Sequence, residues 1–161
     1  MERIRRLLQH PVYRECLEAN FKAEEKREYC HHDLEHFLAV ARIMYIRVLE
    51  SRLNYSKELI YATALLHDIG RFREYEDHTA HDRAGAVLAG KILPECGFSR
   101  EECEIITDAI LQHRNEPACS GELSKLLYEA DKSSRNCSFC RMKKSCKWSD
   151  EKKRMHWEHL G

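Results

Sequence analysis

Apolar residues return at helical spacing along most of this chain, and the sequence contains no strand-like alternation. The segment 33–53 is the clearest case, because its apolar residues fall on one helical face: Leu34, Phe37, Leu38, Val40, Ala41, Met44, Val48 and Leu49. Six helices are predicted, at about residues 4–19, 33–53, 56–70, 79–94, 99–114 and 122–134, with a short one at about 150–159. We therefore expect an all-α fold.

Capping and breaking residues mark the ends of these predicted helices. Polar side chains that can cap helix starts are Ser56, Thr79 with Asp82, and Ser99 with Glu102. Gly70 is placed to stop the third helix, and Pro11 should break or bend the first. The chain contains only three Pro and six Gly, the residues that disfavour helices. Its 161 residues suffice for one domain with a hydrophobic core.

Charge and hydropathy exclude several classes of protein. Lys plus Arg and Asp plus Glu number 27 each, so there is no electrostatic case for nucleic-acid binding. No apolar stretch approaches the roughly 20 residues that cross a bilayer, so no membrane partner is expected. The first six residues lack the apolar core of a signal peptide. We expect a cytoplasmic protein whose eight Cys are reduced thiols or metal ligands.

The candidate chemistry centres on the pair His67-Asp68, which follows the apolar run 60–66. An imidazole beside a carboxylate, at the end of a buried helix, can chelate a divalent metal. Further ligand-type residues lie at the margins of apolar stripes on separate predicted helices: His36, His81, His113 and Asp131. A single histidine on such a face is more often a hydrogen-bonded core residue. Four such residues on four helices together predict a metal site.

The order of these residues resembles that of the HD superfamily of metal-dependent phosphohydrolases. Residues 64–71, Ala-Leu-Leu-His-Asp-Ile-Gly-Arg, are nearly the central signature of that family. The segments 81–85 and 109–114 resemble those that supply further ligands in its binuclear members, and the likeness runs from about residue 32 to 135. The resemblance implies a single HD-domain bundle of about six helices over residues 31–135, a helical segment at 1–30 packed on it, and a Cys-rich tail at 136–161.

The resemblance also implies how divalent metals would be held. The implied ligands are His36, His67, Asp68, His81, His113 and Asp131. Asp68 is the expected catalytic residue and would bridge two ions of Fe, Mn or Zn, with His81 and His113 on one ion and the other ligands on the second. A mononuclear site without His81 and His113 stays open as the alternative. His32 and His78 compete with the proposed histidine ligand that follows each of them.

Such a site predicts hydrolysis of a small phosphate ester, from a nucleotide or related metabolite, by a metal-activated water. Basic residues beside the proposed ligands are expected to bind the substrate phosphate: Arg71, Arg114, Lys132 and Arg135. Two alternatives stay open, a binuclear-iron HD oxygenase and a non-catalytic metal or redox sensor that uses the Cys tail. The sequence leaves the oligomeric state open.

The tail contains a second candidate site, because Cys137, Cys140 and Cys146 form a C-x2-C-x5-C arrangement. Such thiols can bind zinc or an iron–sulfur cluster, although free thiols fit the spacing as well. Candidates for a fourth ligand are Cys30, Cys119, His156 and His159.

Helix geometry favours Cys30 as that fourth ligand. Cys30 lies six residues before His36, and Cys137 lies six residues after Asp131. At about 1.5 Å per residue, each cysteine is displaced roughly 9 Å along its helix from the proposed metal site. Antiparallel helices would bring the two cysteines together. Residues 131–135 and the pair at 147–148 around the cysteines also resemble a small bacterial subgroup of HD proteins.

Overall fold

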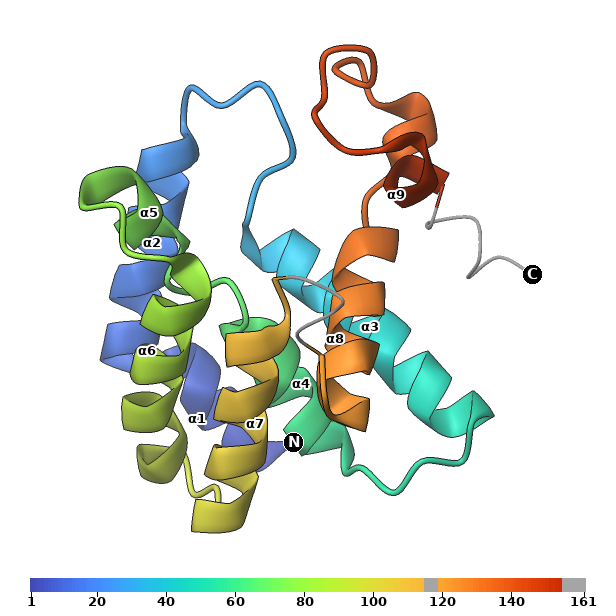
Figure 1. Ribbon diagram of the computed structural model, residues 1–161. Coiled ribbons are helices and arrows are strands. Elements are labelled where there is room, and N and C mark those ends of the chain that lie inside the picture. Colours follow the sequence, from blue (N-terminus) through green and yellow to red (C-terminus); the bar gives the residue numbers. More distant parts are fainter. Residues whose placement is uncertain (115–118, 155–161) are drawn as a thin grey trace.

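A computed structural model describes residues 1–114 and 119–154, and all regular structure in these residues is helical (Figure 1). The elements are α1 (Glu2–Gln9), α2 (Pro11–Glu24), α3 (Leu34–Glu50), α4 (Lys57–Leu66), α5 (Arg71–Glu76), α6 (His81–Glu95), α7 (Arg100–Gln112), α8 (Glu122–Ser133), the 3-10 helix η2 (Cys137–Phe139) and α9 (Asp150–Arg154). The predicted all-α fold class is confirmed.

Helix α4 is the central element of the bundle. Its sequence is apolar almost all round, and seven of its ten residues are buried. Such a helix must be covered on every side, and α1, α3, α6 and α7 pack around it. Because α4 ends at Leu66, His67 and Asp68 follow it in the interior of the molecule.

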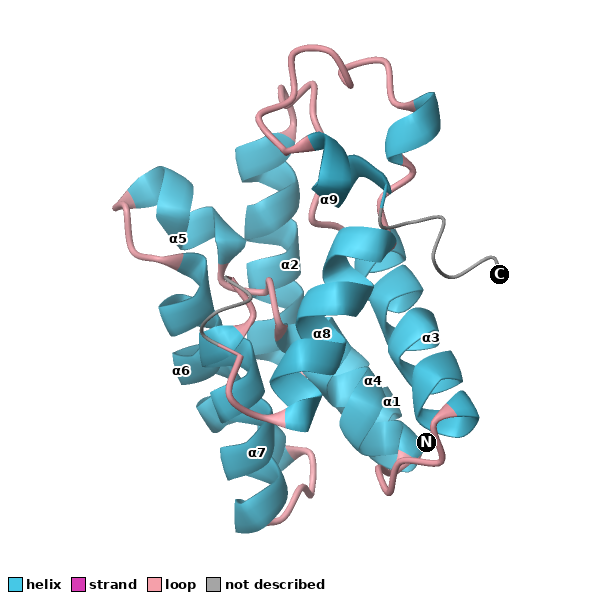
Figure 2. Cartoon of the chain, turned by 45° about the vertical axis from the view of Figure 1, so that its right-hand side comes forward, coloured by secondary structure: helices cyan, strands magenta, loops and turns pink. Residues whose placement is uncertain are grey.

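The remaining helices pack on both sides of α4 (Figures 1 and 2). Helix α3 packs against α8, while α6 packs against α7 and α5. Helix α7 contacts α8, which joins the two sides, and α2 lies against α5. Helices α1 and α2 contribute Ile4, Leu7, Tyr13 and Cys16 to the common hydrophobic core. The N-terminal segment therefore shares one core with the bundle, while the predicted domain limits stay a prediction.

The helix predicted at residues 4–19 is broken near Pro11, as expected, into α1 and α2. The break is at His10, whose backbone is extended with φ −64° and ψ 127°, and Pro11 is the first residue of α2. The residue before a proline is kept out of the helical conformation, whereas proline itself suits the first turn of a helix. Helix α2 then continues to Glu24.

Two of the three predicted caps form. Ser56 accepts a hydrogen bond from the Leu59 N–H, and Ser99 forms a reciprocal capping box with Glu102. The prediction for Thr79 is wrong, because Ala80 occupies the N-cap position of α6 and no side chain caps this helix.

Gly70 begins a helix rather than ending one. Helix α4 ends at Leu66, and Gly70 is the N-cap of the short helix α5, which was not predicted. A Cβ atom on Gly70 would lie 2.6 Å from the Gly85 nitrogen and 2.8 Å from the Ala84 Cβ. Only glycine therefore lets the turn after α4 approach the backbone of α6 this closely.

The C-terminal helix begins where the sequence predicts it, at Asp150. Helix α9 covers Asp150–Arg154, and the rest of the predicted helix lies outside the described residues. Within residues 1–114 and 119–154, no helix has both the length and the apolar character needed to cross a membrane.

Candidate metal centre

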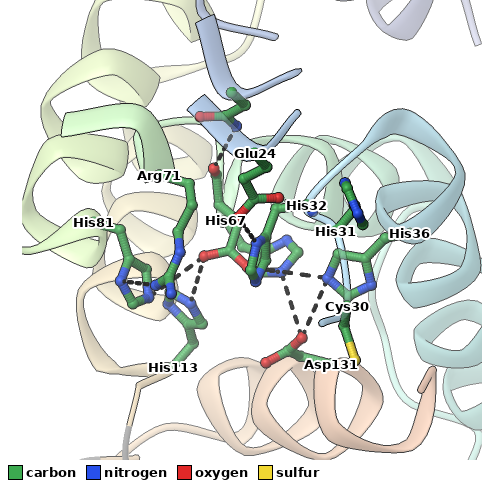
Figure 3. Close-up of polar contacts among 12 residues, drawn as sticks. Glu24, Cys30, His31, His32, His36, His67, Arg71, His81, His113 and Asp131 are labelled. Carbon is green, nitrogen blue, oxygen red and sulfur yellow. Dashed lines mark hydrogen bonds and ion pairs between the residues drawn. The ribbon is translucent and has the colours of Figure 1, made fainter. Parts of the chain in front are cut away.

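The six predicted ligand residues converge at the centre of the bundle (Figure 3). They come from five different helices or the turns that follow them, and each is at most 7% exposed: His36, His67, Asp68, His81, His113 and Asp131. The buried end of α4 supplies the central pair, and α3, α6, α7 and α8 supply the others.

The two carboxylate oxygens of Asp68 face different histidines. Oδ2 lies 3.1 Å from His67 Nε2 and 4.0 Å from His36 Nε2. Oδ1 lies 3.4 Å from His81 Nε2 and 3.6 Å from His113 Nε2. Asp68 is therefore placed between two sets of possible ligands.

Asp131 completes the first of these sets. Its Oδ1 lies 3.3 Å from His36 Nε2 and 3.8 Å from His67 Nε2. Ligand atoms of these residues and Asp68 all lie within 4.8 Å of one another, and the same holds for Asp68 with His81 and His113. The structure thus brings together both the four-residue set and the three-residue set that the sequence suggested.

Local hydrogen bonds orient two of the imidazoles. His67 Nδ1 lies 2.7 Å from the Ala64 carbonyl oxygen, and His113 Nδ1 lies 2.6 Å from the Ile110 carbonyl oxygen. A carbonyl only accepts, so each Nδ1–H is the donor. In the neutral imidazole, Nε2 of each ring then carries the lone pair, and it faces Asp68.

The other two imidazoles are held by side chains. His36 Nδ1 lies 3.2 Å from Ser134 Oγ, which itself donates to the Asp131 carbonyl oxygen. His81 Nδ1 lies 2.8 Å from Glu74 Oε2, which also accepts from Arg71 at 2.6 Å. Metal-binding histidines typically make such contacts through the second ring nitrogen. Glu74 and Ser134 had no signal in the sequence.

Several buried polar atoms in this cluster have no hydrogen-bond partner among the described residues: His36 Nε2, His67 Nε2 and Asp68 Oδ1. Buried nitrogen and oxygen atoms are normally paired. All three atoms belong to the two ligand sets, and imidazole nitrogen with carboxylate oxygen is a donor combination that suits Fe, Mn or Zn. The residues present therefore fit a divalent metal.

The charges of the cluster also call for a cation. Burial raises the pKa of Asp68, but the charges of His67 and His32 outweigh it and hold that pKa well below its usual range. Burial likewise raises the pKa of Asp131, but Lys132 holds that pKa well below its usual range. Burial lowers the pKa of His67, yet the two carboxylates raise it to about 9. The cluster thus attracts positive charge, which a proton or a metal ion can supply.

His32 also reaches this centre, together with Glu24, which the sequence did not indicate. His32 Nδ1 lies 2.6 Å from Glu24 Oε1, and His32 Nε2 lies 3.8 Å from Asp68 Oδ2. Glu24 is buried and accepts a further hydrogen bond from the Tyr75 hydroxyl. His36, not His32, belongs to the four-residue ligand set, and His81, not the exposed His78, belongs to the three-residue set.

Asn20 fixes the turn that carries the central pair. Its Nδ2 donates to the Asp68 carbonyl oxygen at 3.0 Å, and its Oδ1 accepts from the Phe72 N–H at 2.7 Å. Asn20 is buried in α2. The sequence offered one indication of this role, an asparagine among apolar helix residues, because a buried amide needs hydrogen-bond partners.

The centre lines a cavity of about 650 Å3 that is rich in positive charge. Nine basic side chains line it: Arg27, Arg71, Arg114, Lys132, Arg135, Lys143, Lys147, Lys152 and Lys153. Only three of its lining residues are acidic. All four residues predicted to bind substrate are in this lining, and the other five were not predicted.

All four of these residues also have partners in the protein, and Arg114 NH2 donates to Glu74 Oε1 at 3.4 Å. Arg71 donates to Glu74, Lys132 pairs with Asp131, and Arg135 donates to the His31 carbonyl oxygen at 2.6 Å. Their role in substrate binding stays a prediction.

The cysteines proposed for the tail site, Cys30, Cys137, Cys140 and Cys146, line the same cavity, and all four are free thiols. In the described part of the chain, the histidine–aspartate sets are the only groups of three or more such ligand atoms found within 4.8 Å. The four sulfurs therefore lie at one cavity but not at ligand spacing. Cys119 instead donates to the Gln112 carbonyl oxygen, and His156 and His159 lie outside the described residues.

Comparison with known proteins identifies related sequences and a related fold. The HD domain family matches residues 33–136. An uncharacterized protein of Clostridium beijerinckii is 42% identical over 153 residues, which are 95% of this chain and 96% of that protein. The bifunctional uridylyltransferase/uridylyl-removing enzyme of Cereibacter sphaeroides is 35% identical over 82 residues, which are 51% of this chain and 8% of that enzyme.

A solved structure supports the fold. A crystal structure of a predicted HD superfamily hydrolase from an uncultured Thermotogales bacterium matches with a TM-score of 0.65 and 24% sequence identity. The match covers 91% of this chain and 84% of that chain. The region matched by the family, residues 33–136, contains every residue of the histidine–aspartate cluster. This chain belongs to the HD domain superfamily.

Proposed function

We propose that this protein is a metal-dependent phosphohydrolase that acts on a small phosphate ester. The proposal rests above all on Asp68, whose two carboxylate oxygens face separate histidine sets at one cavity. The first set, with His36, His67 and Asp131, and the second, with His81 and His113, would each hold one divalent ion. Bound there, the ions would supply Lewis acidity that activates a water and neutralises phosphoryl oxygens.

The charge of the cavity favours a phosphorylated substrate. Nine basic side chains against three acidic ones create a site for an anion, and arginine can bind phosphate through two hydrogen bonds. A metal or redox sensor without an anionic ligand would need no such excess of positive charge. The basic lining therefore favours an enzyme with a phosphorylated substrate over a sensor.

A nucleotide or related metabolite suits the rest of the cavity. Its volume of about 650 Å3 falls in the usual range of sites for small molecules. Tyr29 and Trp148 line it as well, and aromatic rings of this kind can stack on a nucleobase.

His32 is placed to donate a proton to the leaving group. Its Nδ1 contacts buried Glu24, which orients the ring, and its Nε2 points to the Asp68 side of the cavity. His32 belongs to neither ligand set, so it can carry a proton while the other histidines bind metal. Positioned general acids typically contribute about 10²–10⁴-fold to a rate.

Release of inorganic phosphate from a panel of nucleotides and sugar phosphates, with Mn²⁺ or Fe²⁺ added, tests the proposed activity. Asp68→Asn should abolish turnover, whereas Asp108→Asn on the exposed face of α7 should leave it unchanged. No turnover with any phosphate ester by the metal-loaded wild-type protein would overturn the proposal.

The role of His32 has its own test. His32→Gln should lower kcat by about 10²–10⁴-fold while metal content stays at the wild-type level. His36→Gln should instead reduce metal content, because it removes a proposed ligand. His31→Gln, at an exposed neighbouring position, is the matched control. Loss of metal in His32→Gln would assign this residue to the ligands instead.

A further inference from the structure

Two segments far apart in the sequence meet at the rim of the cavity, and each carries thiols. Cys30 lies in the loop between α2 and α3, and the other three tail cysteines lie in η2 or after it. Arg135 NH1 donates to the His31 carbonyl oxygen at 2.6 Å, and the Tyr29 hydroxyl donates to the Ser145 carbonyl oxygen at 3.4 Å. These contacts hold the loop of Cys30 against the tail (Figure 1).

The four thiols lie at one wall of the molecule. Cys30, Cys137, Cys140 and Cys146 all line the same cavity. The Cys140 N–H donates to the Cys137 carbonyl oxygen at 3.3 Å, which closes the C-x2-C segment into a tight turn. Paired cysteines at this spacing are a common half-site for a metal.

The tail has almost no hydrophobic core of its own. From residue 136 to 153, only Cys137 and Lys153 are buried, and Phe139 is 77% exposed. No residue of this segment belongs to the hydrophobic core of the bundle. Segments that bury so little apolar surface usually need a disulfide or a metal to hold one conformation, and these cysteines form no disulfide.

We propose that one thiolate-ligated metal centre is held by Cys30, Cys137, Cys140 and Cys146. This centre is separate from the histidine–aspartate cluster, and it fixes the tail as a wall of the cavity. Four thiolates are a soft donor set that selects zinc or an iron–sulfur cluster. Each thiol would release its proton to solvent as metal binds. This inference does not depend on the proposed hydrolysis.

Spectroscopy of the Co²⁺-substituted protein tests the centre directly. Cobalt bound by thiolates gives a sulfur-to-metal charge-transfer absorption that a site of histidine and aspartate alone cannot give. We expect this absorption in the wild-type protein and in Asp68→Asn. It should be lost in Cys30→Ser and Cys140→Ser and retained in Cys103→Ser, whose thiol lies on α7 away from the cavity.

Analysis of the protein as purified distinguishes the two metals. Zinc that a thiol-specific mercurial releases would identify a zinc centre, whereas equimolar iron and acid-labile sulfide would identify an iron–sulfur cluster. Either result supports the centre. Absence of thiolate-dependent metal in the wild-type protein, by both analysis and cobalt absorption, would overturn it.

Limited proteolysis tests whether the centre holds the tail. Seven Lys and Arg residues between 141 and 154 are sites for trypsin. Cleavage there should become at least several-fold faster in Cys140→Ser than in Cys103→Ser, while circular dichroism shows an intact helical bundle in both. Equal cleavage rates would overturn the structural role of the centre.

Discussion

Replacing Asn20 with alanine should loosen the turn that carries the candidate metal centre. The Asn20 amide connects α2 to the Asp68 carbonyl oxygen and to the Phe72 N–H in the first turn of α5. Both partners lie in the segment that places the Asp68 carboxylate between its two histidine sets. The substitution should therefore reduce both stability and metal affinity.

The two lost hydrogen bonds determine the expected size of the stability effect. The Phe72 N–H loses the acceptor it has at 2.7 Å, and a buried donor without a partner costs about 1–3 kcal/mol. The Asp68 carbonyl oxygen still accepts from the Arg71 N–H at 3.0 Å, so the second loss costs about 1 kcal/mol. Together these losses amount to about 2–4 kcal/mol, which lowers Tm by roughly 4–16 °C in a chain of this length.

Thermal unfolding followed by circular dichroism measures this effect in metal-free protein. Titration of the same variant with Mn²⁺ should give a Kd about 10–100-fold weaker than that of the wild-type protein, as is typical when an orienting partner of a metal ligand is removed. Asn54→Ala, at an exposed position outside the helices, is the matched control. A Tm and a Mn²⁺ affinity like those of the control would refute the role assigned to Asn20.

Two further predictions concern close packing and pH. Gly70→Ala should destabilise the fold by about 1–3 kcal/mol, because the new Cβ would lie 2.6 Å from the Gly85 nitrogen. Gly90→Ala is the control, since nothing lies within 4 Å of a Cβ there. Equal denaturation midpoints for the two variants would contradict this prediction. His32 lowers the pKa of Glu24 to about 2, against burial, from an ordinary value of 4.5. The stability that this carboxylate contributes is therefore present above pH 4.5 and lost as pH falls toward 2. Urea denaturation should accordingly show a gap between Glu24→Gln and wild type that narrows on acidification; a constant gap would refute the pairing.

The position of the central pair followed from the sequence because one local pattern determines it. Helix α4 is apolar nearly all round, so it had to lie inside the bundle, and the pair at its end had to be buried. The other ligand residues lie at the margins of apolar faces, and packing those faces together also brings the ligands together. The resemblance to HD proteins supplied their grouping around Asp68.

Features that depend on long-range polar contacts could not be predicted in this way. Helix α5 has six residues, none of them fully buried, and Phe72 alone packs against the core, so periodicity gives little signal for it. Its first turn is held by Asn20 from α2, a partner 52 residues earlier in the chain. Glu24 likewise contacts His32 across a loop. A hydrogen bond between distant residues leaves no spacing pattern, although a polar residue within an apolar environment indicates that some partner exists.

The Mn²⁺ content of the wild-type protein, Asp68→Asn and Asp108→Asn tests the central claim most directly. Manganese prefers imidazole and carboxylate over thiolate, so after loading and removal of free metal it reports the histidine–aspartate cluster alone. We predict that wild type and Asp108→Asn retain two ions per chain and that Asp68→Asn, with its helical fold intact, retains neither. Wild-type Mn²⁺ content in Asp68→Asn would contradict the bridging position of Asp68, and with it the proposed metal centre.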